Sequence, residues 1–345
     1  MAEALTWDPL DGAGGRVAGV ALPVTYAVGT VNCWIFPDRP VTLVDPGMLH
    51  AGGFERLQAA LAERGLALAD VDQVVVTHGH PDHWGAVGAV VEASDAVVLG
   101  TAEELRKITA MSRWDFPPDE IDLLVRMIAR LGFPPEVAAL APDLMRATIT
   151  AATAPLDPAS TRAVHEGDTV ALGAYATVAG IHAGHVTAHL CLDADVFYVS
   201  GDHLLADITP NPFFELDATR PELRRASLPE YLDSLPLLAD QIGAAPVLPG
   251  HGPTFDDAAA VVAVLRRKAD ARTEEMLALL AGAGPEGWTP VELAERAFPD
   301  EAGGDVFLAV AECAGHLDRL VADGRAHVDP TGRYAVTSGS SPAPA

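Results

Sequence analysis

Four potential metal ligands lie within six residues of this sequence, directly after a short hydrophobic segment. Residues 73–77 form a β-branched run that is typical of a buried strand, and residues 85–93, rich in Ala and Val, are typical of a helix. The polar turn between them contains His78, His80, Asp82 and His83. Such a turn holds its side chains at one edge of a sheet, where ligand sites are common. Because imidazole and carboxylate groups suit zinc, iron or manganese, the turn is predicted to be a metal site and not a solvated loop.

The H-x-H-x-D-H spacing of this turn resembles the signature of the metallo-β-lactamase superfamily. Further motifs of that family follow in the expected order, namely Ala183-Gly184-His185-Val186, Ser200-Gly201-Asp202 and Pro249-Gly250-His251-Gly252. Upstream, residues 41–47 match the strand and the aspartate, here Asp45, that support the ligand loop in the family. The resemblance spans residues 41–252. It implies an α/β fold, an αββα sandwich with a site for one or two metal ions at one edge of its two sheets.

The resemblance also implies a role for each of these side chains. One metal ion would be held by His78, His80 and His185, and the other by Asp82, His83 and His251, with Asp202 between them. Both ions are expected to be zinc, with iron or manganese as alternatives. Two such ions share a hydroxide that attacks a carbonyl group, and they stabilise the oxyanion that results. Asp82 would accept the proton of the hydroxide, and Asp45 would orient a ligand histidine.

The sequence departs from the family pattern in one loop. Many members carry Gly-His-Thr-Pro-Gly-His where this chain has Gly184-His185-Val186-Thr187-Ala188-His189. The ligand position is kept and the Pro-Gly turn is lost, so the shape of the loop is not predicted. His203, Asn211 and Trp114 are candidates for substrate contacts. A place in the core or beside a ligand is the alternative for His189 and His203.

Apolar periodicity and turn residues predict the other elements of a catalytic domain over residues 1–255. Strands are expected at residues 16–23, 26–36, 42–44 and 96–99, then at 168–170, 175–179, 190–192 and 196–199 in a second sheet, with a last strand at 246–248. Helices are expected at residues 54–64 and 228–243.

Residues 101–154 interrupt this pattern, because they carry helical periodicity and no strand signal. Since family loops at this point project to the active-site side, the segment is expected to be a helical insertion that covers the metal site. A peripheral role without effect on catalysis is the alternative. An apolar substrate channel could be lined by Met111, Trp114, Phe116, Met127 and Met145, although such residues at helical spacing more often belong to a core.

Beyond residue 255 the sequence changes to long helices, expected at residues 256–280, 289–297 and 305–323 and followed by a hairpin at 326–336. Thr289, Pro290 and Glu292 form a capping box with proline at the first helical position, a strong start signal. Three helices and a hairpin resemble the winged-helix module of family members of the beta-lactamase-like protein 2 type, assigned here to residues 256–337. Residues 338–345 are predicted to be a disordered tail.

Net charge argues against a nucleic-acid partner. The chain has 22 Lys and Arg against 48 Asp and Glu, a formal net charge of −26, whereas phosphate backbones are bound by clustered basic residues. Residues 256–335 alone hold eight basic and fifteen acidic residues. The C-terminal module is therefore expected to serve packing, dimerisation or closure of a pocket, so that a homodimer is one option.

Cysteine usage and the N-terminus predict a cytoplasmic protein. Cys33, Cys191 and Cys313 lie far apart, without a C-x-x-C pair, and indicate a reducing compartment. The first residues lack the basic start and the apolar segment of a secretory signal. No apolar run reaches the roughly 18–20 residues that span a bilayer, so no membrane contact is expected. A missing export signal argues against a periplasmic β-lactamase.

The predicted function is a binuclear metal-dependent hydrolase with a small-molecule acyl substrate, which is a thioester, ester or lactone. Hydroxyacylglutathione hydrolases are similar, but they bind glutathione through basic residues near the C-terminus, where this chain is acidic. A coenzyme A or acyl-carrier thioester is therefore an equal alternative. Two other activities of the same fold are an endoribonuclease, which the charge disfavours, and an iron-dependent persulfide dioxygenase, which the second ligand set disfavours. A non-catalytic binding module would be expected to have lost ligands, and none is lost here.

Overall fold

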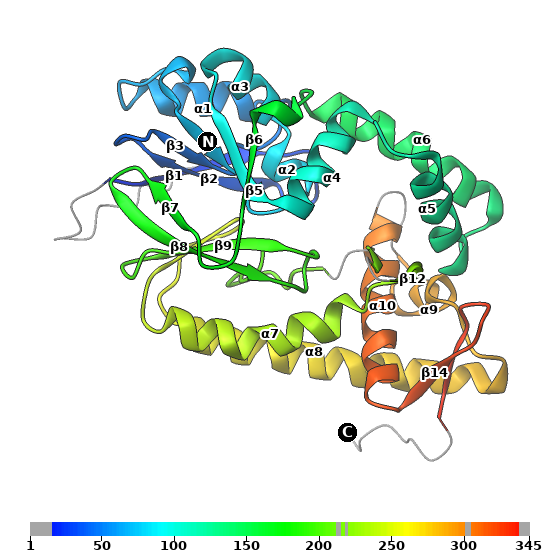
Figure 1. The fold of residues 1–345 in the computed structure, drawn as a ribbon. Coiled ribbons are helices and arrows are strands. Elements are labelled where there is room, and N and C mark those ends of the chain that lie inside the picture. The colour runs from blue at the N-terminus through cyan, green and yellow to red at the C-terminus, as the bar shows by residue number, and fades with distance from the viewer. Residues whose placement is uncertain (1–15, 212–214, 218–219, 301–304, 338–345) are drawn as a thin grey trace.

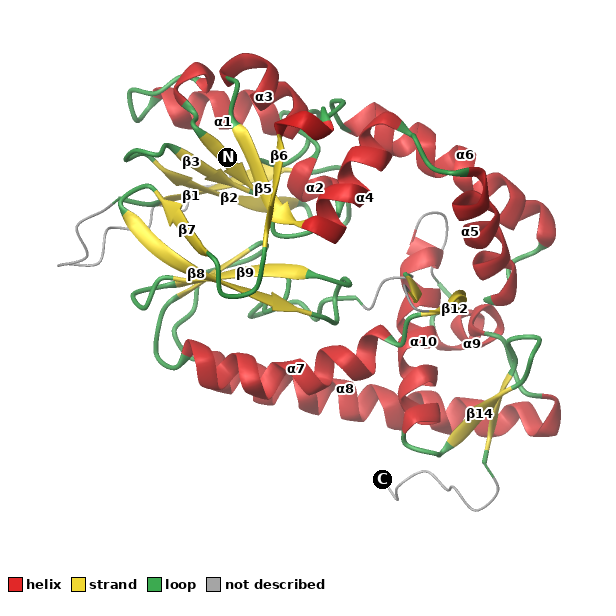
Figure 2. Ribbon diagram, in the orientation of Figure 1, coloured by secondary structure: helices red, strands yellow, loops and turns green. Residues whose placement is uncertain are grey.

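Two facing β-sheets form the larger part of the molecule in the computed structural model, which describes residues 16–211, 215–217, 220–300 and 305–337 (Figures 1 and 2). The first sheet has the order β1 (Ala18–Pro23), β2 (Thr30–Phe36), β3 (Thr42–Val44), β4 (Gln73–Val75), β5 (Val97–Thr101) and β6 (Thr161–Val164). Its first three strands are antiparallel, and β3 to β6 are parallel. The second sheet has the order β13 (Val247–Pro249), β10 (Tyr198–Gly201), β9 (His189–Asp193), β8 (Tyr175–His182) and β7 (Thr169–Leu172). In it, β13 and β10 are parallel and the other pairs are antiparallel.

Helices cover the outer face of each sheet. On the first sheet lie α1 (Gly53–Ala62) and α3 (Val87–Ser94), and beneath the second lie α7 (Ser227–Ile242) and α8 (Ala258–Leu280) (Figure 1). The short helix α2 (Pro81–Trp84) follows β4. This arrangement confirms the predicted αββα sandwich.

Side-chain alternation along the central strands explains why the two sheets pack face to face. In β2, Trp34 and Phe36 belong to the core between the sheets, and Leu192 of β9 meets them from the other side. Cys33 and Ile35 point the opposite way, into the core under α1 and α3. Because both faces of each sheet are covered, such strands are apolar at nearly every position.

The helical insertion consists of α4 (Ala102–Arg113), α5 (Pro118–Arg130) and α6 (Pro135–Ala152), which arch away from the sandwich (Figure 1). The first of them packs on the core of the first sheet through Leu105 and Ile108. Ile128 and Leu131, at the end of α5, instead share one core with Leu277 of α8. The insertion and the C-terminal helices therefore form one packed unit, in addition to the layers of the sandwich.

The C-terminal segment contains α8, then α9 (Pro290–Ala297) and α10 (Asp305–Ala322), and a hairpin of β14 (Ala326–Val328) and β15 (Tyr334–Val336). The predicted capping box of α9 is confirmed, because Thr289 Oγ1 accepts a hydrogen bond from Glu292 N at 3.2 Å and Glu292 Oε2 accepts one from Thr289 N at 2.8 Å. The order of elements agrees with the expected one, and its assignment as a winged-helix module stays a prediction. The predicted tail at 338–345 lies outside the described residues.

Two strand pairings were not predicted. Strand β6 (Thr161–Val164) follows the insertion and completes the first sheet next to β5, although no strand was predicted at these residues. Within β6, Val164 is the one buried residue, so the strand shows little of the alternation of buried and exposed side chains that marks a strand in a sequence. The second pairing joins β11 (Leu216–Asp217) and β12 (Arg220–Arg224).

Among the described residues, no helix combines the length and the apolar character needed to cross a membrane.

Leu277→Ala tests whether the insertion and the C-terminal helices share one core. Leu277 is fully buried, so its truncation is expected to lower the free energy of unfolding by about 2–5 kcal/mol, measured by chemical denaturation. Leu237→Ala on α7, where the side chain is 71% exposed, is the control and should change it by less than about 0.5 kcal/mol. Hydrogen exchange should then quicken in α5 as well as in α8. Unchanged protection of α5 would show that the two helices are stabilised separately.

Candidate metal centre

Loops at one edge of the two sheets bring the predicted ligands together. The turn with His78 and His80 follows β4, and the loop with His185 joins β8 to β9. Asp202 follows β10, and His251 follows β13. Because β10 and β13 are parallel neighbours, their two loops begin side by side.

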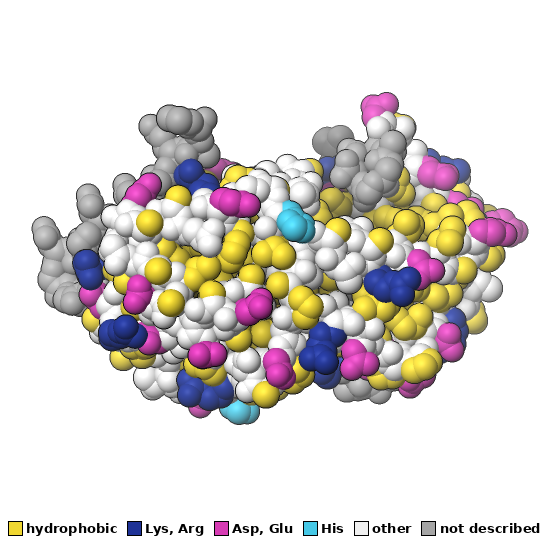
Figure 3. All heavy atoms as spheres, turned by 90° about the horizontal axis from the view of Figure 1, so that it is seen from above, with side chains coloured by type: hydrophobic (Ala, Val, Ile, Leu, Met, Phe, Trp, Pro, Cys, Tyr) yellow, Lys and Arg dark blue, Asp and Glu magenta, His cyan; other side chains and the backbone are white. Residues whose placement is uncertain are grey.

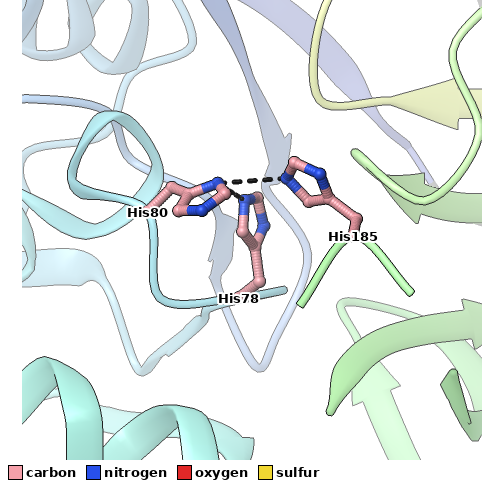
Figure 4. A group of neighbouring side chains, drawn as sticks. All are labelled: His78, His80 and His185. Atoms are coloured by element: carbon pink, nitrogen blue, oxygen red, sulfur yellow. Dashed lines mark hydrogen bonds between the residues drawn. The ribbon is translucent and has the colours of Figure 1, made fainter. Parts of the chain in front are cut away.

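Three histidines converge at one point of this edge (Figure 4). Nδ1 of His80 lies 2.9 Å from Nε2 of His78 and 3.0 Å from Nε2 of His185. His78 is fully buried and His185 is 5% exposed. These three nitrogens form one group whose ligand atoms lie within 4.8 Å of one another, and an overlapping group consists of His78, His83 and Asp202.

A second group adjoins the first and consists of Asp82, His83 and His251. Nε2 of His251 lies 3.3 Å from Oδ2 of Asp82 and 3.3 Å from Oδ2 of Asp202. The same Asp202 oxygen lies 3.4 Å from Nε2 of His83 and 3.8 Å from Nε2 of His185, which belongs to the first group. Asp202 therefore stands between the two groups, and the structure brings all seven predicted ligands into one cluster.

Glycines next to the ligands allow this close approach. Gly201 has φ +48°, and a Cβ atom there would lie 2.6 Å from His189 Cε1 and 2.7 Å from Thr77 Oγ1. A Cβ atom at Gly250 would overlap Asp202 Oδ1. Any side chain at these two positions would push the loops apart, which explains the Gly-Asp and Gly-His pairs in physical terms.

The outer nitrogen of each of four histidines has a hydrogen-bond partner, which turns the inner nitrogen toward the cluster. Oδ2 of Asp45 lies 2.8 Å from Nδ1 of His83 and accepts a hydrogen bond at 2.7 Å from Oγ1 of Thr77. The Thr77 oxygen in turn lies 3.0 Å from Nδ1 of His78. Nδ1 of His185 faces the Asn211 carbonyl at 3.1 Å, and Nδ1 of His251 faces the Thr30 carbonyl at 2.5 Å. With Nδ1 as donor, each ring would present the lone pair of Nε2 to a metal ion that displaces any proton there, as metal ligation requires.

Burial and charge give the two groups different electrostatic character. Burial lowers the pKa of His80 to about 4 and that of His185 to about 3, so these rings are neutral at pH 7. Burial would also lower the pKa of His251, but the Asp202 carboxylate raises it to about 10. Neutral imidazoles and buried carboxylates are the donors that divalent transition metals prefer.

The cluster fits a bound cation better than it fits a packed core. Nε2 of His83 and Oδ1 of Asp202 are both buried and have no hydrogen-bond partner in the protein. A buried polar atom without a partner destabilises the fold unless something else satisfies it. Both atoms belong to the cluster, so a metal ion held there would satisfy them.

The other candidates lie around this cluster and not within it. His189 is fully buried, and its Nε2 accepts a hydrogen bond at 3.1 Å from the backbone N of Asp202. His203 pairs with Ser234 at 2.8 Å instead. Asn211 contributes its carbonyl to His185, as described above, and its Nδ2 donates to the Leu308 carbonyl of α10 at 3.1 Å.

A buried ion-pair network holds the loop whose shape the sequence left open. Arg225 is 6% exposed, and its Nη2 donates to the Gly184 carbonyl at 3.0 Å. Its Nη1 donates to Thr187 Oγ1 at 2.9 Å and to Glu215 Oε2 at 2.6 Å. Thr187 stands where many family members have proline, and its hydroxyl donates to the same Glu215 oxygen at 2.6 Å. A hydrogen-bonded network thus replaces the missing Pro-Gly turn.

The same network reaches the first ligand turn through α4. Lys107 Nζ lies 2.5 Å from Glu215 Oε1 and 2.9 Å from Glu104 Oε1. The other oxygen of Glu104, a side chain that is 1% exposed, accepts a hydrogen bond from the backbone N of Gly79 at 2.9 Å. Gly79 lies between two predicted ligands, so one chain of charges spans both ligand loops. These charged residues carry no sequence motif, and nothing in the sequence alone marked them.

Thr77→Val removes the hydroxyl between Asp45 and His78 and nearly preserves the shape of the side chain. Loss of a group that orients a ligand typically weakens metal binding about 10- to 100-fold, and a weakening of that size is expected here. Competition with a chromogenic chelator measures it. Thr148→Val, at an exposed position of α6, is the matched control. Equal metal affinity of the Thr77 variant and the parent would show that this hydroxyl does not orient His78.

An αββα sandwich with clustered histidines and aspartates at the edge of its two sheets defines the metallo-β-lactamase class of fold. Residues 26–278 match the family model described as the Metallo-beta-lactamase superfamily, and the chain belongs to that superfamily.

Similar proteins span almost the whole chain. Over 313 residues it is 27% identical to the "Probable metallo-hydrolase YqjP" of Bacillus subtilis (strain 168), an alignment that covers 89% of this chain and 92% of that protein. The crystal structure of the metallo-beta-lactamase family protein TTHA1429 from Thermus thermophilus is similar with a TM-score of 0.76 and 26% identity, over 93% of this chain and 98% of that one. A beta-lactamase domain protein from Burkholderia ambifaria shares the fold, with a TM-score of 0.74 and 24% identity over 98% and 95% of the two chains. The likeness therefore extends through the insertion and the C-terminal helices.

Proposed function

We propose that this protein is a metal-dependent hydrolase of a small-molecule thioester, ester or lactone. The observation that carries the proposal is the convergence of five imidazoles and two carboxylates into two adjoining ligand groups that share Asp202. Two adjoining groups suit two ions, and paired ions are typical of hydrolysis. The name of the Bacillus subtilis relative, a probable metallo-hydrolase, is in line with this activity.

The residues that would hold two zinc ions are the seven of the cluster, namely His78, His80 and His185 in one group, Asp82, His83 and His251 in the other, and Asp202 between them. Bound divalent ions supply Lewis acidity and lower the pKa of water. Asp82 is the proposed proton acceptor, because it stands in the H-x-H-x-D-H turn and its carboxylate is buried within the cluster, with Oδ2 3.3 Å from Nε2 of His251. Asp45 and the carbonyls of Asn211 and Thr30 would keep the ligand rings in place during turnover.

A substrate panel tests the proposed class. Purified protein is assayed with acyl thioesters, aryl esters, lactones, single-stranded RNA and a persulfide, the last with an oxygen electrode. Hydrolysis of at least one acyl substrate, lost on chelation and restored by zinc, is the expected result. Cleavage of RNA without any acyl hydrolysis would establish the endoribonuclease instead, and oxygen consumption on the persulfide would establish the dioxygenase.

A further inference from the structure

An apolar pocket of about 160 Å³ lies between the three helices of the insertion, outside the metal cluster. It is lined by Trp114 and Phe116 next to α4, by Ile121 and Leu124 of α5 and by Met145 of α6. Among the lining residues of this pocket, Glu120 is the one that carries a charge. The pocket is therefore suited to a hydrocarbon group and not to a polar one.

The inner end of this pocket adjoins the ligand turn. Met111 of α4 lines the pocket, and its Cε would lie 3.8 Å from a Cβ atom built on Gly79, between two proposed ligands. On the other side the pocket is closed by Leu216, which follows Glu215 of the charge network around the His185 loop. Met111 thus lies near the turn that carries His78 and His80, and Leu216 follows a residue that is hydrogen-bonded to the loop that carries His185.

Trp114, which lines the pocket, has a strained backbone conformation. Trp114 caps α4 in the left-handed conformation, with φ 51° and ψ 47°, where a bulky side chain is strained and glycine is the usual residue. In this position its ring meets that of Phe116 edge to face, with a centroid distance of 5.5 Å. Strain of this kind is characteristic of sites that hold a ligand.

We propose that this pocket is the acyl subsite of the enzyme and that it takes an apolar acyl group of about six carbons. The inference rests on the proposed hydrolase function and names the substrate class for it. A cavity of about 150 Å³ holds one benzene ring, so about 160 Å³ suits a hexanoyl chain or a single aromatic ring. Met145, which lines the pocket, is 39% exposed, so the pocket reaches the surface there, and Leu140 and Leu144 of the same helix are exposed as well. Figure 3 shows apolar side chains gathered at the end of the molecule where α5 and α6 lie.

The first test compares S-acyl-N-acetylcysteamine thioesters from acetyl to decanoyl. Each methylene that enters the pocket should raise kcat/KM up to about fourfold, and the gain should stop near six carbons, where the chain reaches solvent. Ile121→Trp fills the pocket at a position outside the buried cores described above, so it should remove the gain along the series while metal content stays the same. Leu144→Trp, on the exposed face of α6, is the matched control and should keep the gain.

The second test reports on the pocket without any turnover. The chain has six methionines, and ¹³C-methyl labelling makes each visible by NMR, with Met111→Leu and Met145→Leu variants to assign the two signals. Hexanamide should shift the Met111 and Met145 signals, acetamide should not, and the fully buried Met48 and Met276 should stay unchanged with both.

The two tests separate failure of this proposal from failure of the proposed function. Turnover of thioesters with equal kcat/KM along the series, and no methionine shift with hexanamide, would overturn the acyl subsite and leave the hydrolase intact. If no acyl compound is hydrolysed, the proposed function is wrong, and an unshifted Met111 signal would then overturn the pocket as well.

Discussion

Metal analysis of the purified protein is expected to find close to two transition-metal ions per chain, predominantly zinc. Two ligand groups adjoin at the sheet edge, and the proposal assigns one ion to each. His185 belongs only to the first of these and His251 only to the other. His185→Asn and His251→Asn should therefore each retain about one ion, whereas His50→Asn, at an exposed position, should retain two.

The same measurement can contradict the binuclear proposal. One iron per chain in the parent protein, together with oxygen consumption on a persulfide, would favour the dioxygenase. Loss of both ions in each of the two variants would instead show that the groups fill cooperatively, and dialysis against limiting zinc would then show a single binding step.

Asp82→Asn is expected to lower turnover by about 10²-fold or more while the fold stays intact. An amide cannot accept the proton that the proposed mechanism transfers to the carboxylate, and a positioned proton acceptor typically contributes about 10²- to 10⁴-fold. The measurement is kcat on the best thioester of the panel, alongside the metal content and the circular dichroism spectrum of the same sample.

Asp195→Asn is the control for this substitution. Asp195 lies in the exposed turn between β9 and β10 with φ 61°, a conformation that asparagine adopts readily. Its turnover should equal that of the parent. If Asp82→Asn keeps its metal ions and hydrolyses the substrate at the parent rate, Asp82 is not the proton acceptor.

The cluster itself was predictable because its short motifs, in their order along the chain, resemble those of the metallo-β-lactamase superfamily. His78 and His80 are two residues apart, and Asp202 and His251 each follow a glycine at a strand end. The turn at residues 78–83 was predicted to be a metal site from its own residues, whereas His185, Asp202 and His251 were added only through the family resemblance. Their roles as ligands stay a prediction, which the metal analysis above will decide.

The supports around the cluster were not predictable, since they depend on which distant elements become neighbours. Glu104 and Arg225 lie 121 positions apart and meet through Lys107 and Glu215 only once the insertion is folded. Charged residues at these positions look like ordinary solvated surface in the sequence. Strand β6 was missed for a related reason, because it is specified by backbone pairing with β5 more than by its own side chains.

The insertion was recognised as helical, but its packing partner could not be inferred. Hydrophobic periodicity shows that a helix has an apolar face and does not show what covers that face. Here Ile128 and Leu131 pack against Leu277 of a helix almost 150 residues further along the chain. The insertion thus links two parts of the molecule, with α4 next to the ligand turn and α5 against the C-terminal helices, and its role as a cover of the metal site stays a prediction.

Asn211 connects the cluster with the C-terminal helices through its two ends. Its carbonyl faces Nδ1 of His185, and its side-chain amide donates to the Leu308 carbonyl of α10. Whenever two binding events share such a link, each changes the free energy of the other by the same amount. If docking of α10 favours the orientation of His185 that the proposed metal site needs, an ion bound at His185 would favour that docking to an equal degree. Under the proposed function, the stability of the C-terminal segment and the affinity for metal would then depend on each other.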